Sequence, residues 1–76
     1  MPHNNGTVFV AIGSLTQAMR AQEALSRAAI PSTVKKSASA RGHGCVHGVQ
    51  ISALQENNAM QVLYAHKIHV RERISE

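Results

Sequence analysis

Cys45 is the only cysteine of this chain and the residue best suited to chemistry. It lies within residues 41–48 (RGHGCVHG), where a histidine stands two positions away on each side. A thiol reacts as the thiolate, and nearby cations or imidazolium groups favour that anion. We therefore expect Arg41, His43 and His47 to stabilise a Cys45 thiolate. The surrounding glycines leave room for another protein's active site, so the pattern predicts a thiol that transfers a group between proteins.

Two other roles for the cysteine stay open. In an extended strand His43, Cys45 and His47 point the same way, so one thiolate and two imidazoles can bind Zn²⁺ or Cu⁺. A fourth ligand is not evident, unless His66 or His69 approaches in the fold. Alternatively, the cysteine is a small apolar residue at a strand start. The chain is then a non-catalytic module for protein interaction or dimerisation.

The carboxylates do not form an evident catalytic pair. Glu23 and Glu56 fall in predicted helices, while Glu72 and Glu76 lie in the charged C-terminal tail. General acid–base catalysis needs such groups to be placed together at the reacting bond. The chain also has no phosphate-binding loop motif. We therefore expect a protein that is not an enzyme and that uses no cofactor.

Length and composition predict one small domain over residues 1–76. Apolar residues make up 43% of the chain, which favours a globular rather than a disordered protein. Phe9 and Tyr64 are the only aromatic residues, so the core must be built from aliphatic side chains. A domain of this size buries a small share of its surface. Dimerisation would bury more apolar area, so we expect a homodimer.

The charge of the chain limits its partners. A net charge of +4 favours acidic partners or anions. The basic residues are dispersed, apart from Lys35, Lys36 and Arg41 ahead of the cysteine, and no aromatic pair can stack bases. We therefore do not expect a nucleic-acid partner.

The cell compartment is also predicted from the sequence. No apolar run reaches the roughly 18 residues that cross a bilayer, and residues 1–6 lack the features of a signal peptide. One unpaired cysteine suits a reducing compartment. We expect a cytoplasmic protein with no membrane partner.

The first half of the chain predicts a strand, a helix and a second strand. Residues 7–12 are β-branched and apolar on both faces, which is typical of a central strand. Ser14 and Gln17 have the spacing of a capping box. Apolar residues recur from there at helical spacing to Ala29, until a proline stops the helix. Residues 32–36 form the second predicted strand.

A mobile loop that carries the cysteine is predicted next, over residues 37–45. This stretch is rich in small residues and is interrupted by glycines. Residues 46–51 then alternate as a third strand, and we expect Val49 and Ile51 to face the core.

The C-terminal part predicts a second helix and a last strand. The capping-box pattern recurs over residues 52–55. Residues 68–70 contain two apolar β-branched residues and predict a final short strand. Residues 1–6 and 72–76 are expected to be flexible ends. The predicted buried side of the second helix comprises Ala59, Met60, Val62 and Leu63. His66 either borders that side or lies, like His69, at the surface or an interface.

The two halves of the chain are related by a weak repeat with an offset of 38 residues. The order βαββαβ that results is that of the ferredoxin-like α+β fold, a four-stranded antiparallel sheet with both helices on one face. The other face is then open or used for dimerisation. The matching pairs are Ser14 and Ser52, Gln17 and Gln55, Ala21 and Ala59, Leu25 and Leu63, and Ile30 and Ile68.

The sequence resembles a family of small bacterial selenium/sulfur carrier-like proteins. Its members have a strand, a serine, alanines at helical spacing, an Ile-Pro pair and a lone cysteine that opens the third strand. Residues 12–25, the stretch Ala29-Ile30-Pro31 and Cys45 match that pattern here. The similarity covers roughly residues 7–70.

The resemblance implies a mechanism for the cysteine. A cysteine desulfurase or similar donor would pass a sulfur or selenium atom to Cys45, which would hold it as a persulfide or perselenide. An acceptor protein would then collect the atom. In this mechanism Arg41, His43 and His47 would stabilise the anion.

Overall fold

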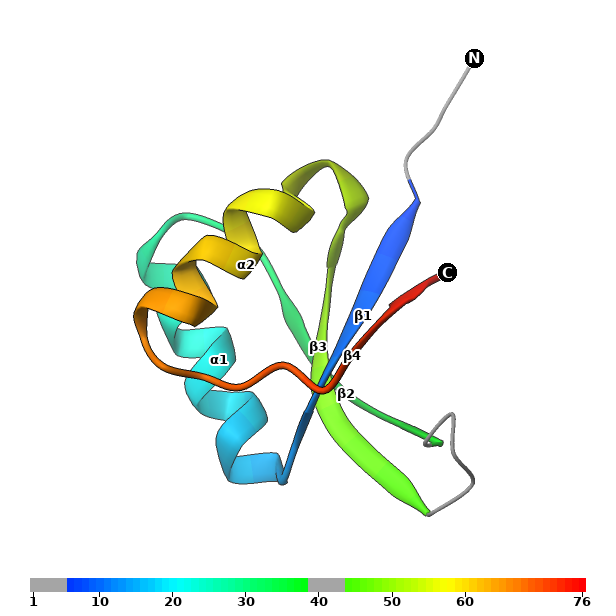
Figure 1. The fold of residues 1–76 in the computed structure, drawn as a ribbon. Coiled ribbons are helices and arrows are strands. Elements are labelled where there is room, and N and C mark those ends of the chain that lie inside the picture. Colours follow the sequence, from blue (N-terminus) through cyan, green and yellow to red (C-terminus); the bar gives the residue numbers. More distant parts are fainter. Residues whose placement is uncertain (1–5, 39–43) are drawn as a thin grey trace.

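The strands form one antiparallel sheet, and the helices lie together on one of its faces (Figure 1). The computed structural model describes residues 6–38 and 44–76. The strand order is β2-β3-β1-β4, so the predicted ferredoxin-like α+β fold is confirmed. The elements are β1 (Thr7–Gly13), α1 (Leu15–Arg27), β2 (Thr33–Ala38), β3 (Cys45–Ser52), the 3-10 helix η1 (Ala53–Gln55), α2 (Glu56–Ala65) and β4 (Glu72–Ser75).

The main core lies between the sheet and the helices. β1 is an inner strand, flanked by β3 and β4, and it is buried on both faces as its sequence predicts. Val49 and Ile51 of β3 face this core, which confirms the prediction. Alternate residues of a strand point to opposite faces, so the odd-numbered residues of β3 lie on the helix side. The buried members of the core are Val8, Val10, Ile12, Ala21, Leu25, Ile30, Val49, Ile51, Ala59 and Leu63.

The opposite face of the sheet has a smaller apolar cluster and a polar network. Phe9, Ala11 and Val46 are buried there, with Ile74 packed against them. At one end Gln50 Nε2 donates to Glu76 Oε1 at 2.7 Å, and Thr7 Oγ1 donates to the same oxygen at 2.9 Å. These hydrogen bonds, to Gln50 first and then Thr7, lower the pKa of Glu76, and the charge of Lys35 acts in the same direction. Because its charge acts on Glu76, Lys35 lies on this face of the sheet, opposite the helices.

Both helices end in the same type of turn, which extends the sequence repeat into three dimensions. After α1, Ile30 N–H donates to the Leu25 carbonyl at 2.8 Å, and Ala29 N–H donates to the Ser26 carbonyl at 3.0 Å. After α2, Ile68 and Lys67 make the matching bonds to Leu63 and Tyr64 at 2.9 and 3.0 Å. This is the Schellman pattern, and its turn residue adopts positive φ. Those residues are Ala29 (φ 62°) and Lys67 (φ 59°).

Glycine at either turn position is expected to stabilise the protein. A side chain in the left-handed region costs about 1–2 kcal/mol, which glycine avoids. After allowing for the greater freedom of glycine in the unfolded chain, we expect Ala29→Gly and Lys67→Gly each to raise the free energy of unfolding by about 1 kcal/mol. Urea unfolding followed by circular dichroism measures this. Ala28→Gly is the matched control, because Ala28 has φ −91°. If Ala29→Gly destabilised as much as Ala28→Gly, the assignment of the turn would be wrong.

The start of the second helix differs from the prediction. The Ser14–Gln17 capping box of α1 is present in full. Ser52, by contrast, caps η1, and its Oγ accepts from Leu54 N–H at 3.2 Å. α2 therefore begins at Glu56, one turn later than the capping pattern indicates. The reciprocal bond is absent because the Gln55 side chain instead accepts from Asn58.

The last strand also lies later than predicted. Residues 68–70 are not a strand, and the predicted flexible end at 72–76 instead contains β4, which pairs antiparallel with β1. The turn after α2 uses Ile68, so the chain first meets β1 where Arg71 N–H donates to the Ala11 carbonyl at 2.8 Å. Arg73 of β4 then pairs with Glu56 at 3.3 Å. No helix in the described parts of the chain is long and apolar enough to span a membrane.

Candidate functional site

Cys45 is the first residue of β3, and its side chain is exposed. The predicted loop over residues 37–45 is therefore too long at both ends. β2 continues through Ser37 to Ala38, and Ala38 pairs with Cys45. The thiol thus stands on a paired strand at the end of the β2–β3 hairpin where the chain passes from one strand to the other, and the register of the two strands determines its neighbours.

The hairpin register places two basic groups on the same side of the sheet as the thiol. His47 is two residues from Cys45 on β3, so both side chains leave the same face. Lys36 pairs directly with His47 and therefore shares that face. Diagonal neighbours in an antiparallel pair are about 7–8 Å apart, within reach of a lysine. Lys35 pairs with Gly48 and faces the other side.

The four predicted site residues are only partly represented in the structure. Cys45 and His47 lie together as expected, and His47 is half-buried. Arg41 and His43, predicted to stabilise the thiolate, lie outside the described residues. The structure adds Lys36, which the sequence pattern did not distinguish from Lys35. Lys36 could have been identified only from the register in which β2 pairs with β3. No feature of the sequence sets that register.

The alternative metal site is only partly covered by the described residues. Within residues 6–38 and 44–76, no group of three or more metal-binding side chains is found. Cys45 and His47 supply two ligands on one face, and the third predicted ligand, His43, is outside the described residues. His66, for which the sequence left both the buried side of the second helix and the surface open, is exposed. Its Nδ1 lies 2.9 Å from the Val62 carbonyl oxygen at the end of its own helix.

The glycines beside the thiol have different roles. Gly44 has φ +85°, and a Cβ there would meet no atom of the described residues within 4 Å. Gly48 is buried, and a Cβ there would collide with the Val10 carbonyl of β1. The expectation that Gly48 gives a partner access to the sulfur is therefore wrong. Gly48 instead allows β1 and β3 to approach, beside a register shift between Ala11 and Gly13.

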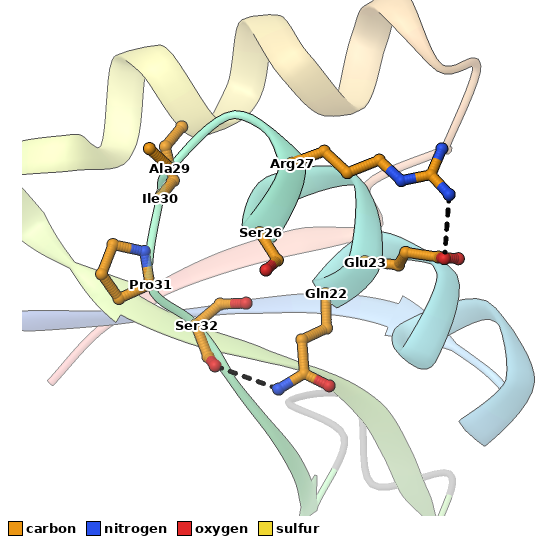
Figure 2. Close-up of a pocket in the computed structure, with 8 residues that line it drawn as sticks. All are labelled: Gln22, Glu23, Ser26, Arg27, Ala29, Ile30, Pro31 and Ser32. Carbon is orange, nitrogen blue, oxygen red and sulfur yellow. Dashed lines mark hydrogen bonds and ion pairs between the residues drawn. The ribbon is translucent and has the colours of Figure 1, made fainter.

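A separate cavity of about 680 Å³ lies at the end of α1, away from the thiol (Figure 2). Gln22 Nε2 donates to the Ser32 carbonyl at 3.1 Å on one side of the helix. Glu23 and Arg27 pair with each other at 3.2 Å on another side. Figure 2 shows that these side chains point in different directions and do not meet around one point. The lining has the hydroxyls of Ser26 and Ser32 but no thiol or imidazole. Its one carboxylate, Glu23, is paired with Arg27, so the lining offers no free base to activate a serine.

Comparisons with known proteins identified no relative of this chain. No protein-family model matches the chain, and neither the curated proteins nor the solved structures contain a significant match. The function must therefore be argued from the residues around Cys45 and from the rest of the molecular surface.

Proposed function

We propose that this protein carries a sulfur or selenium atom on Cys45 and passes it from a donor protein to an acceptor. The observation that carries the proposal is the exposed thiol at the end of a hairpin, with His47 and Lys36 on its side of the sheet. The resemblance of the sequence to selenium/sulfur carrier-like proteins supports it. The protein then acts as a carrier and has no turnover of its own.

The transfer requires only thiol chemistry. The Cys45 thiolate attacks the terminal sulfur of a persulfide on the donor, such as a cysteine desulfurase. A new S–S bond forms at Cys45 as the donor's S–S bond breaks, and the donor leaves as a thiolate. The acceptor's thiolate then removes the terminal sulfur in the same way. No outside oxidant or reductant is needed, because zero-valent sulfur moves unchanged between thiolates.

The described residues suit both steps. A thiolate is the reacting form, and cations near it favour that form. Lys36 lies on the same face as the thiol and is exposed, so its ammonium group can reach the anion or an incoming persulfide. The structure has a single free cysteine. The persulfide therefore cannot be lost to an intramolecular disulfide, which a carrier must avoid.

Incubation with a cysteine desulfurase and cysteine is expected to add one sulfur atom to the protein, detected as an increase in intact mass. Cys45→Ser should show no increase. Lys36→Ala is expected to slow the gain roughly threefold, the size of effect of one exposed charge pair. Lys35→Ala is the matched control, because Lys35 has the same charge but faces the opposite side of the sheet.

Two results would contradict the carrier proposal. One is an unchanged mass for the wild-type protein although the desulfurase itself becomes persulfidated. The other is an equal gain in Cys45→Ser, which would place the added sulfur elsewhere. Equal rates for the two lysine variants would remove Lys36 from the site.

A further inference from the structure

The charged residues form a pattern that the Cys45 site does not use. Two ion pairs join described residues, Glu23 with Arg27 and Glu56 with Arg73. Within residues 6–38 and 44–76, the other arginines and lysines make no ion pair. Of these, Lys35 and Lys36 belong to β2. The remaining ones are Arg20, Lys67 and Arg71.

The segment after α2 presents its cations to solvent. It runs past α1 to the start of β4 (Figure 1), and a cavity lined by Arg20, Arg27, His66 and Ile68 shows that it meets α1. Ile68 and Val70 pack against the main core, whereas His69 between them and Lys67 and Arg71 on either side are exposed. The alternation is forced by the core, because turning the apolar residues inward turns the polar ones outward. We call the exposed residues Lys67, His69 and Arg71 the basic crest.

An apolar groove adjoins the basic crest. It has a volume of about 450 Å³ and lies between α2 and the crest segment. Tyr64 stands at its edge with 84% of its surface exposed, which is unusual for a large side chain on a small domain. Exposed tyrosines of this kind are enriched at protein interfaces. The α2 groove is lined by Met60, Gln61, Tyr64, Ile68, His69 and Val70.

We propose that the basic crest and the α2 groove together bind an acidic segment of a partner protein, with its apolar side chains in the groove. The exposed cations of the crest attract anionic groups, and the apolar lining of the groove beside them favours apolar side chains. Glutamates and leucines in one peptide supply both. A nucleic acid satisfies the cations only through phosphates, and stacking on bases needs more than Tyr64, the single exposed aromatic of the described chain.

This surface is distinct from the Cys45 site. It shares no residue with the hairpin that holds Cys45, His47 and Lys36. The proposal therefore does not depend on sulfur transfer, and Cys45→Ser should leave the binding unchanged.

A fluorescein-labelled peptide of alternating glutamate and leucine is the probe, and fluorescence anisotropy at low ionic strength measures its affinity. Lys67→Gln with Arg71→Gln should weaken binding about tenfold, because exposed charges at an interface act through attraction to the opposite charge. Lys35→Gln with Lys36→Gln removes the same charge from β2 and should change the affinity less than threefold by the same reasoning. Tyr64→Ser should also weaken binding.

Each contrary result overturns the proposal. Equal losses in the two double variants would mean that the peptide responds only to net charge. An unchanged affinity in Tyr64→Ser would mean that the α2 groove is not used. Tighter binding of a labelled oligouridylate than of the peptide would assign the surface to nucleic acid. Circular dichroism of each variant verifies that the fold is retained.

Discussion

Gly48→Ala is expected to lower the free energy of unfolding by about 3 kcal/mol or more, among the largest effects that single substitutions produce. A Cβ at this position would collide with the Val10 carbonyl oxygen, which belongs to the backbone of β1 and cannot rotate away. Relief requires separating β1 from β3, the two central strands. A chain of this length has roughly 4–11 kcal/mol of total stability. Urea unfolding followed by circular dichroism should therefore show a large shift in midpoint.

Gly44→Ala is the control for this substitution. Gly44 has φ +85°, but no atom of residues 6–38 or 44–76 lies within 4 Å of the added Cβ. Only the backbone preference is lost, so we expect about 1–2 kcal/mol. Equal effects at the two glycines would show that the collision with β1 is relieved at little cost, and the close approach of the strands would then not be the reason for glycine.

Leu63→Ala is expected to lower the free energy of unfolding by about 3 kcal/mol, within the 2–5 kcal/mol that buried leucines cost. The Leu63 side chain is fully buried, with 0% exposure, and its carbonyl also accepts the N–H of Ile68 in the turn after α2. The loss combines apolar transfer with the cavity left behind. Thermal or urea unfolding measures it, and Leu25→Ala should behave alike because Leu25 occupies the repeat-related position.

A leucine-to-alanine substitution at the surface is the control, because it separates the effect of burial from any effect of helix propensity. Leu54 is 78% exposed. Leu54→Ala removes the same atoms without opening a cavity, so its effect should stay within about 0.5 kcal/mol. A cost at Leu54 close to that at Leu63 would contradict the assignment of the core.

Local sequence signals predicted most of the elements of this fold. A continuous apolar strand must be buried on both sides, and β1 is. A hydroxyl followed three residues later by glutamine starts a helix, and Ser14 does so. Where the same signal occurred again at Ser52, a 3-10 turn formed first. There the Gln55 side chain accepts from Asn58, a residue outside the motif.

The strand nearest the C-terminus could not be placed from the sequence. Residues 68–70 have better strand composition than residues 72–75, yet only the later segment pairs with β1. Residues 68–70 form part of the tight turn after α2 and of the segment that runs past α1, so they are not available to pair with β1 (Figure 1). Which residues pair as a strand depends on where the preceding connection brings the chain alongside the sheet. The residue composition of a segment does not contain that information.

By itself the sequence determined the order of the elements, the repeat that relates the two halves and the position of the one cysteine. These depend on local spacing and on residue type, which are properties of the chain alone. Only the tertiary structure decided that Lys36 rather than Lys35 shares a face with Cys45, and that Gly48 serves the contact between β1 and β3. The reason is that a shift of one residue in strand register exchanges the two faces, and register is set by the whole sheet.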